Sequence, residues 1–314
     1  MCGLNVSSLR SYANKLRLSL RSNLKHSANE DITRLWNETS KKNINVDCYL
    51  NNDKPLKEVK KELILDEMNS NLKHVKSLTL QGAAVSSVIE NIPKAQITKW
   101  TAEVNKLPAV LFNFVRKAMI QQLATNSNLA RWRKMTDATC QLCKASSQTN
   151  KRVLNNCAAP IALERYKTRH DVILRIIANW LKTVIAIQDT LHVDLISPSF
   201  KPLNEIFKTL RPDIAIVKDK VIYILELTIC HETNLESSQT YKQSKYENIK
   251  KDCVDRYKHY TLKLSTVEIT SLGHISSIVM FLKSVSKINR LPNDIMSTII
   301  GNSSNIYKHR NDLS

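Results

Sequence analysis

The 314-residue chain is long enough for one large domain or two modest ones, and its hydrophobic content of 42% is ordinary for a folded protein. Lys and Arg number 47 against 28 Asp and Glu, and the resulting formal charge of +19 favours nucleic acid over a membrane as partner. No apolar run reaches the roughly 20 residues of a membrane span, only four glycines occur and no two aspartates are adjacent. These absences exclude a transmembrane helix, a glycine-rich phosphate loop and the usual polymerase palm.

Residues 1–74 are predicted to be helical, polar and basic, with a looser stretch at 43–54. Leu9, Tyr12, Leu16 and Leu20 fall on one helical face, which predicts a basic amphipathic helix. The Arg-, Lys-, Ser- and Leu-rich composition before Glu30 is also that of a mitochondrial transit peptide, which is the alternative. Seven cysteines without an apolar leader argue for a reducing compartment and against a disulfide framework.

The next part, 75–160, has the periodicity of helices, at 78–89 and at 97–123 with a break at Pro108. It then carries the basic run Arg131-Trp132-Arg133-Lys134 and a cysteine cluster at 140–157. The character changes after the strongest predicted helix, 165–187. Runs rich in β-forming residues at 214–217 and 221–229 are followed by a predicted helix at 237–260 and a strand at 265–270. The tail, 296–314, is polar, and we expect it to be frayed from Asn302.

The two β-rich runs form a predicted hairpin, and the length of its loop decides which residues face each other. A two-residue loop at 219–220 pairs Asp213 with Glu226, and a four-residue loop gives the same register. A three-residue loop would place the two acids on opposite faces. With an even loop, both carboxylates lie side by side within reach of a single cation.

Glu226 is the single charged residue in the run 221–227, as expected for a carboxylate in a central strand. Such a carboxylate needs a cation or strong donors, unless the strand is an edge strand with Glu226 solvated or paired with a lysine. The following predicted helix has an apolar stripe at Tyr246, Ile249, Cys253, Tyr257 and Tyr260. Extending this stripe backward by four residues places Lys242 on the inward face, with Lys245 beside it. A lysine there would orient or deprotonate a metal-bound water, or neutralise charge on a reacting phosphate.

The pattern Arg211-Pro212-Asp213, twelve residues, Glu226 and then Lys242-x-x-Lys245-Tyr246 resembles the restriction-like endonuclease domain of site-specific non-LTR retrotransposons. That domain belongs to the PD-(D/E)xK nuclease superfamily. The resemblance implies an α/β fold with a mixed sheet flanked by helices, preceded by a mostly α-helical region. It also implies that Asp213 and Glu226 bind Mg²⁺ and that Lys242 or Lys245 is the catalytic lysine. Thr228 stands where the superfamily pattern has its lysine. In the retrotransposon branch the lysine is similarly displaced to the following helix, so this departure resembles that branch.

Upstream, Cys140-x2-Cys143-x8-Arg152-x4-Cys157 resembles the zinc knuckle that precedes that domain, in which a histidine is expected where Arg152 stands. Arginine cannot ligate zinc, because its guanidinium stays protonated. Two alternatives remain open: three thiolates completed by water or His170 around Zn²⁺, or an empty knuckle whose cysteines act as small core residues.

The sequence Arg169-His170-Asp171 is similar to the family's motif at the start of the first nuclease helix, where His170 would serve either the active site or the structure. The basic side chains expected to contact phosphate are Arg131, Arg133, Lys134 and Arg169.

The resemblance covers roughly residues 75–270 and does not include a reverse transcriptase. It implies a helical linker with a degenerate knuckle (75–160 and 140–157), an endonuclease domain at 161–295 and a polar tail at 296–314, behind a basic region (1–74) of uncertain role. The expected activity is Mg²⁺-dependent nicking of double-stranded DNA, with element RNA as a possible second partner. The alternative is a catalytically inactive nucleic-acid-binding remnant. A nuclear location is implied by the resemblance, with the mitochondrion as the alternative.

Overall fold

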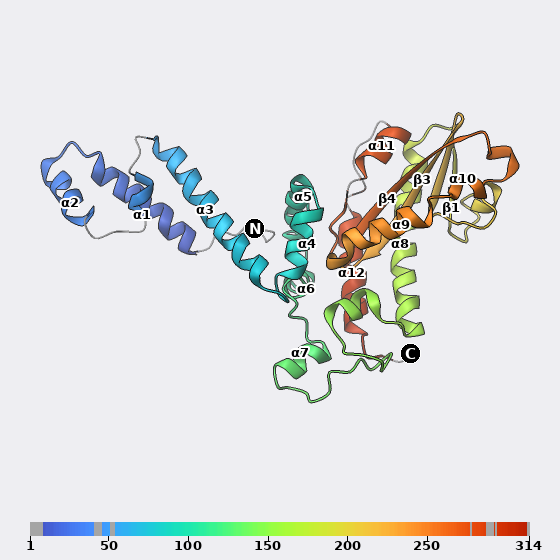
Figure 1. The fold of residues 1–314 in the computed structure, drawn as a ribbon, viewed down its shortest axis with the longest axis horizontal. Coiled ribbons are helices and arrows are strands. Elements are labelled where there is room, and N and C mark those ends of the chain that lie inside the picture. The colour runs from blue at the N-terminus through green and yellow to red at the C-terminus, as the bar shows by residue number, and fades with distance from the viewer. Residues whose placement is uncertain are drawn as a thin grey trace. The chain divides into compact units, whose positions relative to one another are not determined.

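The computed structural model describes residues 9–40, 46–50, 54–276, 278–286, 292 and 294–312. Its contacts divide the chain into two compact units, Met1–Leu78 and Thr79–Ser314. Figure 1 shows helices throughout the first unit and a β-sheet in the second. The predicted boundary at 160/161 therefore does not separate two units, because the helices that follow Leu78 pack with the sheet.

The first unit is helical, as predicted. Its elements are α1 (Leu9–Lys25), α2 (Glu30–Ser40), the 3-10 turn η1 (Asp47–Leu50) and α3 (Leu56–Ser77). Its small core consists of Leu18, Val46, Leu50, Val59 and Leu63.

The apolar stripe predicted for α1 does not face this core. Tyr12, Leu16 and Leu20 are 58%, 54% and 60% exposed. The helix packs instead through the face that carries Arg21, whose guanidinium pairs with Asp47 (Nη2 to Oδ2, 2.6 Å) and lies over the ring of Trp36. A buried ion pair has thus taken the place that periodicity alone would give to leucines.

The second unit begins with four helices. They are α4 (Ala83–Asn91), α5 (Lys94–Val104), α6 (Ala109–Met119) and α7 (Asn126–Arg131). Pro93 and Pro108 stand immediately before α5 and α6, where a missing N–H costs nothing, so the predicted helical stretch is broken at Pro108 as expected.

Two hydrogen bonds join these helices to the sheet region. The Ser87 hydroxyl in α4 donates to the carbonyl oxygen of Glu232 (2.7 Å), and the Trp100 indole in α5 donates to that of Leu272 (2.6 Å). The Trp100 ring also stacks on His274, with centroids 3.9 Å apart. Since all these groups are buried or half-buried, α4 and α5 form part of the same packed unit as the sheet.

The sheet has four strands in the order β1 (Thr190–Val193), β2 (Ile214–Lys218), β3 (Val221–Cys230) and β4 (Thr261–Thr270). β2 pairs antiparallel with both β1 and β3, whereas β4 pairs parallel with β3. The parallel step requires a crossover, which the chain makes through the helices between β3 and β4. The mixed sheet flanked by helices that was predicted is therefore present.

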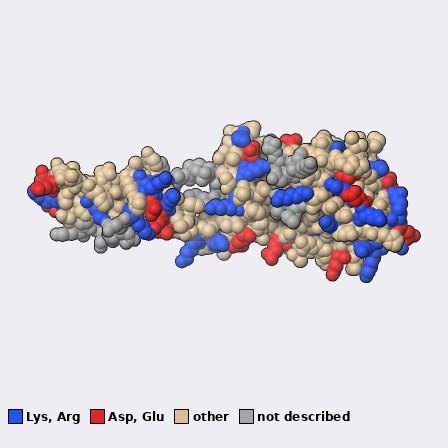
Figure 2. All heavy atoms as spheres, turned by 90° about the horizontal axis from the view of Figure 1, so that it is seen from above, with Lys and Arg blue, Asp and Glu red and all other residues tan. Residues whose placement is uncertain are grey.

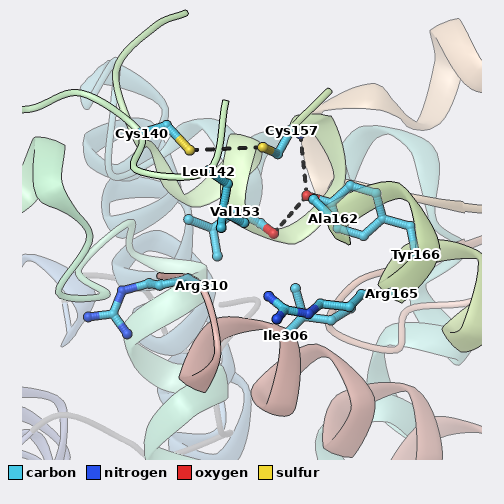
Figure 3. A pocket seen from close by; sticks show the side chains of 9 residues that line it. All are labelled: Cys140, Leu142, Val153, Cys157, Ala162, Arg165, Tyr166, Ile306 and Arg310. Atoms are coloured by element: carbon cyan, nitrogen blue, oxygen red, sulfur yellow. Dashed lines mark hydrogen bonds between the residues drawn. The ribbon is translucent and has the colours of Figure 1, made fainter. Parts of the chain in front are cut away.

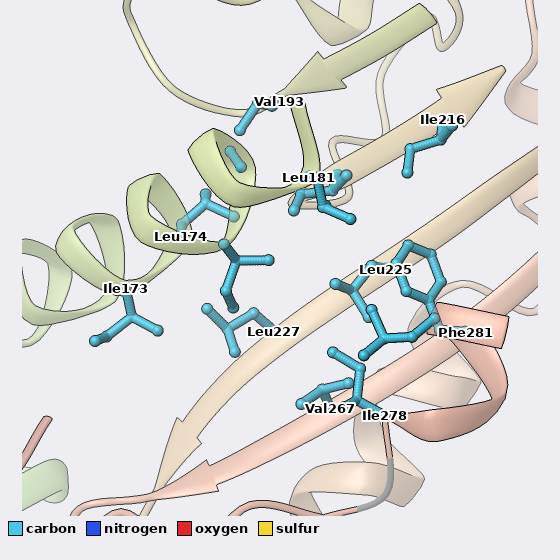
Figure 4. Packing of buried hydrophobic residues seen from close by; sticks show 14 of the residues in the cluster. Ile173, Leu174, Leu181, Val193, Ile216, Leu225, Leu227, Val267, Ile278 and Phe281 are labelled. Atoms are coloured by element: carbon cyan, nitrogen blue, oxygen red, sulfur yellow. The ribbon is translucent and has the colours of Figure 1, made fainter. Parts of the chain in front are cut away.

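Helices cover both faces of the sheet. On one face, α8 (Pro160–Val184), α11 (Val279–Val285) and α12 (Asp294–Lys308) bury a core with the strands. Figure 4 shows Ile173, Leu174 and Leu181 of α8 lying over Leu225 and Leu227 of β3. The opposite face is covered by Leu203, Ile206 and Phe207 from the segment between β1 and β2 and by residues of the crossover between β3 and β4. These crossover elements are η4 (Glu232–Asn234), α9 (Leu235–Lys245), α10 (Ile249–Asp252) and η5 (Asp255–Tyr257).

Two predictions about helices are wrong. The single helix expected at 237–260 is divided, because α9 ends at Lys245 and the chain turns before α10. The tail expected to fray from Asn302 is instead helical to Lys308 as the second half of α12, which buries Ile299, Ile300 and Ile306 and contacts α8. The polar residues between these isoleucines, such as Ser303, face a buried partner rather than water.

No helix in the described part of the chain combines the length and the apolar composition needed to cross a membrane. The longest helix, α8, has 25 residues and carries charged side chains along its whole length.

Candidate active site

The β2–β3 hairpin brings Asp213 and Glu226 together. Lys218 pairs with Val221, so the loop consists of Asp219 and Lys220 alone, and this register places Asp213 opposite Glu226. Asp219 adopts a positive φ of 53°, a conformation that aspartate tolerates better than most residues. The prediction of an even loop is confirmed.

The two carboxylates are buried and are fixed by backbone donors from each other's strands. Asp213 is 8% exposed and Glu226 is 2% exposed. The amide of Asp213 donates to Glu226 Oε2 (3.1 Å), and the amide of Leu227 donates to Asp213 Oδ2 (2.7 Å). Each side chain therefore has one oxygen held by the sheet, which leaves Asp213 Oδ1 and Glu226 Oε1 directed at other groups.

Lys242 faces Glu226 from α9, and its Nζ contacts Glu226 Oε1. The inward position predicted by extending the apolar stripe of Tyr246 and Ile249 backward is thus correct for Lys242. Lys245 is exposed, and its Nζ donates to the Tyr246 hydroxyl (3.1 Å), which itself donates to the carbonyl oxygen of Arg211 (2.9 Å). Of the two candidate lysines, Lys242 is the one that the fold places on the carboxylate pair.

His170 of α8 approaches Asp213 from the other side. Its Nε2 lies 3.4 Å from Asp213 Oδ1, and its Nδ1 lies 3.2 Å from Asp171 Oδ1. Burial lowers the pKa of His170, but the two neighbouring carboxylates outweigh burial and raise that pKa to about 9. His170, which the sequence left between a structural and an active-site role, therefore lies in the site beside two carboxylates that favour its protonated form.

The carboxylates influence one another strongly. Burial, together with the charge of Asp213, raises the pKa of Glu226 above its ordinary value, and the ammonium of Lys242 opposes this shift. A third acid, Asp194, follows β1, and its amide donates to the carbonyl oxygen of Asp213 (2.9 Å). Burial raises the pKa of Asp194 as well, with Asp213 and Asp171 adding to that effect and Arg211 opposing it.

Sequence reasoning missed Asp194. Val193 pairs with Ile214 in antiparallel strands, so Asp194, which follows Val193, lies opposite Asp213, which precedes Ile214. The short β1 was not recognised in the sequence, and without that strand the pairing could not be found.

The pair of carboxylates can hold a magnesium ion only with help. Mg²⁺ is commonly bound through one or two carboxylates, several waters and the substrate's phosphate, so Asp213 and Glu226 fit this hard, oxygen-seeking cation. Among the described residues, no third His, Cys, Asp or Glu ligand atom completes a compact set with them. Lys242 and His170 would have to withdraw from the outward oxygens as the cation enters.

The cysteine cluster is assembled as its spacing suggests. The sulfurs of Cys140, Cys143 and Cys157 all lie within 4.8 Å of one another, with Cys140 Sγ 3.9 Å from Cys157 Sγ. Arg152, at the expected fourth ligand position, donates from Nη1 to Cys143 Sγ (3.5 Å). The three thiols fit a thiophilic metal, whereas the fourth partner is a fixed cation, so the four-coordinate zinc knuckle does not fit this chain.

The loop that carries the cluster is also held by α8. The hydroxyl of Tyr166 lies within hydrogen-bonding distance of the carbonyl oxygens of Arg152 (2.8 Å) and Val153 (2.9 Å) and accepts from the amide of Cys157 (3.3 Å). Figure 3 shows Tyr166, Val153 and Cys157 beside a pocket that borders the cluster. The pocket is lined by Cys140, Leu142, Val153, Cys157, Ala162, Arg165, Tyr166, Ile306 and Arg310.

The environments of two of these thiols differ. The backbone amide of Ala145, with contributions from the neighbouring thiols and Arg152, lowers the pKa of Cys143 to about 7. Burial raises the pKa of Cys157 to about 11. The thiol that Arg152 contacts is therefore the more acidic of these two.

The predicted phosphate contacts divide into two groups. Arg131, Arg133 and Lys134 are exposed. Arg169 is 1% exposed, and its Nη1 donates to the Ser303 hydroxyl (2.9 Å), so the prediction that it contacts phosphate is wrong. The face shown in Figure 2 carries Lys and Arg interspersed with Asp and Glu.

No model of a known protein family matches the chain, and no curated protein matches its sequence. The function must therefore be argued from the arrangement of these residues.

Proposed function

We propose that the chain is a Mg²⁺-dependent endonuclease of the PD-(D/E)xK type that nicks double-stranded DNA one strand at a time and lacks a reverse transcriptase domain. The observation that carries this proposal is the buried pair Asp213 and Glu226, with Lys242 on its outward side. Two buried carboxylates on adjacent strands destabilise a fold unless a cation lies between or beside them. A nuclease uses that instability to bind its metal.

The chain's own residues would divide the work as follows. Asp213 and Glu226 would hold the cation through the oxygens that now face His170 and Lys242. When bound, Mg²⁺ would polarise the phosphodiester and neutralise part of its charge. Lys242, once released from Glu226, would orient the attacking water or stabilise negative charge on the phosphate. Water forms the new bond to phosphorus as the bond to the 3′ oxygen breaks, which leaves a 3′ hydroxyl and a 5′ phosphate.

Basic residues away from the acids would position the DNA. Arg131, Arg133 and Lys134 remain candidates for this role, and the net charge of +19 supports a polyanionic partner. We further propose nuclear DNA as the substrate and element RNA as a second partner, which follow from the retrotransposon resemblance alone. A fluorescent fusion of the full chain would distinguish this location from the mitochondrial alternative.

The test is a nicking assay on supercoiled plasmid with Mg²⁺ or EDTA. Asp213→Asn preserves the shape of the side chain but weakens its hold on a cation, so we expect a loss of at least about 100-fold in nicking rate. Asp219→Asn is the matched control, because Asp219 is an exposed acid of the same hairpin and asparagine also tolerates its positive φ. Nicking that persists in Asp213→Asn or in EDTA would contradict the proposal.

The second candidate is a nucleic-acid-binding remnant without catalysis. The observation that favours it is Arg152, which replaces a metal ligand with a cation at the cysteine cluster. The same assay separates the two functions, because a remnant would retard DNA in a gel and leave the plasmid supercoiled under every condition.

A further inference from the structure

The end of α7 presents an exposed aromatic ring among cations. Arg131, Trp132, Arg133 and Lys134 are consecutive and all exposed, and Trp132 is 38% exposed. The other three tryptophans of the chain, Trp36, Trp100 and Trp180, are buried or half-buried. Figure 1 shows α7 and the loop that follows it at a distance from the strands of the same unit.

The backbone of this turn is rigid and strained at one position. The amide of Lys134 donates to the carbonyl oxygen of Leu129 (2.8 Å) and that of Arg133 to Ala130 (2.9 Å), which is the Schellman pattern of a helix C-terminus. Arg133 holds the left-handed position of this motif, with φ of 58°. Glycine usually occupies that position, because a side chain there costs about 1 kcal/mol. An arginine that persists at a strained position suggests a use for its charge.

The short helix α7 is anchored from behind by its asparagines. The backbone amide of Asn126 donates to the side-chain oxygen of Gln148 (3.1 Å), and the Asn126 side chain donates to the carbonyl oxygen of Thr139 (2.8 Å). The Asn128 side chain donates to the carbonyl oxygens of Gln121 (2.8 Å) and Leu123 (2.6 Å). The backbone that carries Trp132 is therefore held in place before any ligand binds, which lowers the entropy cost of binding.

The three cations are not engaged by carboxylates in the part of the chain that the structure describes. Within the described ranges, Arg131, Arg133 and Lys134 form no ion pair with a carboxylate. They are thus available to an external polyanion. A flat aromatic face between such cations matches a nucleotide, whose base offers a stacking surface and whose phosphate offers a negative charge.

We propose that this turn, residues 131–134, is a stacking platform for single-stranded nucleic acid. An unpaired base stacks on Trp132, and the neighbouring phosphates are held by Arg131, Arg133 and Lys134. A duplex does not offer this contact, because its bases are already stacked on one another. The platform goes beyond the proposed nuclease function and does not depend on Asp213 or Glu226.

The experiment measures binding of the full chain, in EDTA so that no cleavage occurs, to a 2-aminopurine-labelled single strand and to the matching duplex. Trp132→Leu keeps an apolar side chain but removes the aromatic face, and we expect about tenfold weaker binding of the single strand with little change for the duplex. Trp132→Phe keeps a ring and should retain most of the affinity. DNA and RNA strands of one sequence, used side by side, identify which of them the platform prefers.

Arg133→Gly separates binding from folding. Glycine relieves the left-handed strain, so the variant should melt at the same temperature as the wild type or higher. Binding of the single strand should nevertheless weaken, and its salt dependence, the slope of log K against log salt, should become shallower by about 0.7. A purely structural role of Arg133 predicts the opposite, lower stability together with unchanged binding.

Three outcomes would overturn the proposal. Trp132→Leu could bind the single strand as tightly as the wild type. It could lose affinity for single strand and duplex to the same extent. It could instead lose binding to anionic lipid vesicles as strongly as to the single strand, which would show that the turn binds anionic surfaces in general. None of these results depends on whether the plasmid is nicked, so the platform and the nuclease fail separately.

Discussion

The carboxylate hairpin and the cysteine cluster are both candidate metal sites, and they differ in what has happened to their ligands. In the hairpin, Asp213 and Glu226 are both present, and the cations that face them belong to separate helices. In the cluster, the three thiols hold their positions, but Arg152 stands on the fourth side as a permanent cation. Sequence spacing and even three-dimensional closeness of three thiols therefore do not by themselves make a four-coordinate metal site. Which sites can take a metal is decided by the chemistry of the last partner.

The largest effect is expected on the nicking rate, when the two lysines of α9 are substituted one at a time. It tests whether the hairpin and Lys242 together make up the site. Lys242→Ala should lower the nicking rate by about 100- to 1,000-fold, because an oriented cation at a reacting phosphate contributes an effect of that size. Lys245→Ala is the matched control, since its ammonium contacts Tyr246 rather than the acids. Initial rates on supercoiled plasmid provide the measurement. Equal losses in the two variants would mean that the choice between these lysines is wrong.

The next prediction would remove the difference between the two sites by giving the cysteine cluster a fourth metal ligand. Arg152→His supplies a fourth ligand, and we expect the variant to bind one equivalent of Zn²⁺ while the wild type binds none. At a zinc concentration 100-fold above the dissociation constant, binding would stabilise the fold by about 2.7 kcal/mol. Metal analysis after dialysis and thermal melting with and without a chelator would show it. Stoichiometric zinc in the wild type would instead show that three thiolates and water suffice.

A third prediction tests whether His170 is a cation beside Asp213. Its pKa is raised from 6.5 to about 9, so its charged form favours folding; this contribution is fully present below about pH 6.5 and is lost as the pH rises through 9. The effect is on the order of 3 kcal/mol. Unfolding by denaturant at several values between pH 6 and 10 should show a steeper loss of stability for the wild type than for His170→Asn. Parallel curves for the two proteins would contradict the charged histidine.

The smallest effect is expected at the cysteine cluster itself. Cys143→Ser removes the sulfur that Arg152 contacts, but this sulfur is only half-buried, and the loop keeps its hydrogen bonds to Tyr166. The free energy of unfolding should therefore fall by about 1 kcal/mol or less. The corresponding change in the Arg152→His background should be much larger when zinc is present. A large loss in the wild-type background would show that the cluster is more than a remnant.

The hairpin could be predicted from the sequence because its geometry is local. The positions of Asp213 and Glu226 depend only on the number of residues in one short loop, and Lys242 follows from a helical period that begins at Tyr246. In these cases residues near in sequence determine the contact.

The errors concern contacts between residues far apart in the chain. Arg169 was taken for a phosphate ligand because it is basic, and only the packing of α12 on α8, 134 residues away, explains its burial against Ser303. Asp194 was missed for the same reason, since its neighbour Asp213 lies across a strand pair that the sequence did not reveal. Likewise, Leu16 and Leu20 of α1 are exposed, and the buried face of that helix carries Arg21, which pairs with Asp47 in a turn 26 residues away.

The two-residue turn between β2 and β3 has a consequence for how this protein can change in evolution. Side chains alternate between the faces of a strand, so inserting one residue at Asp219 or Lys220 would shift the pairing and separate the acids, although neither acid would be mutated. Inserting two residues would keep them together. Lengths of this turn that differ by an even number therefore keep the carboxylate pair, whereas a relative with an odd difference must have moved that pair or lost it.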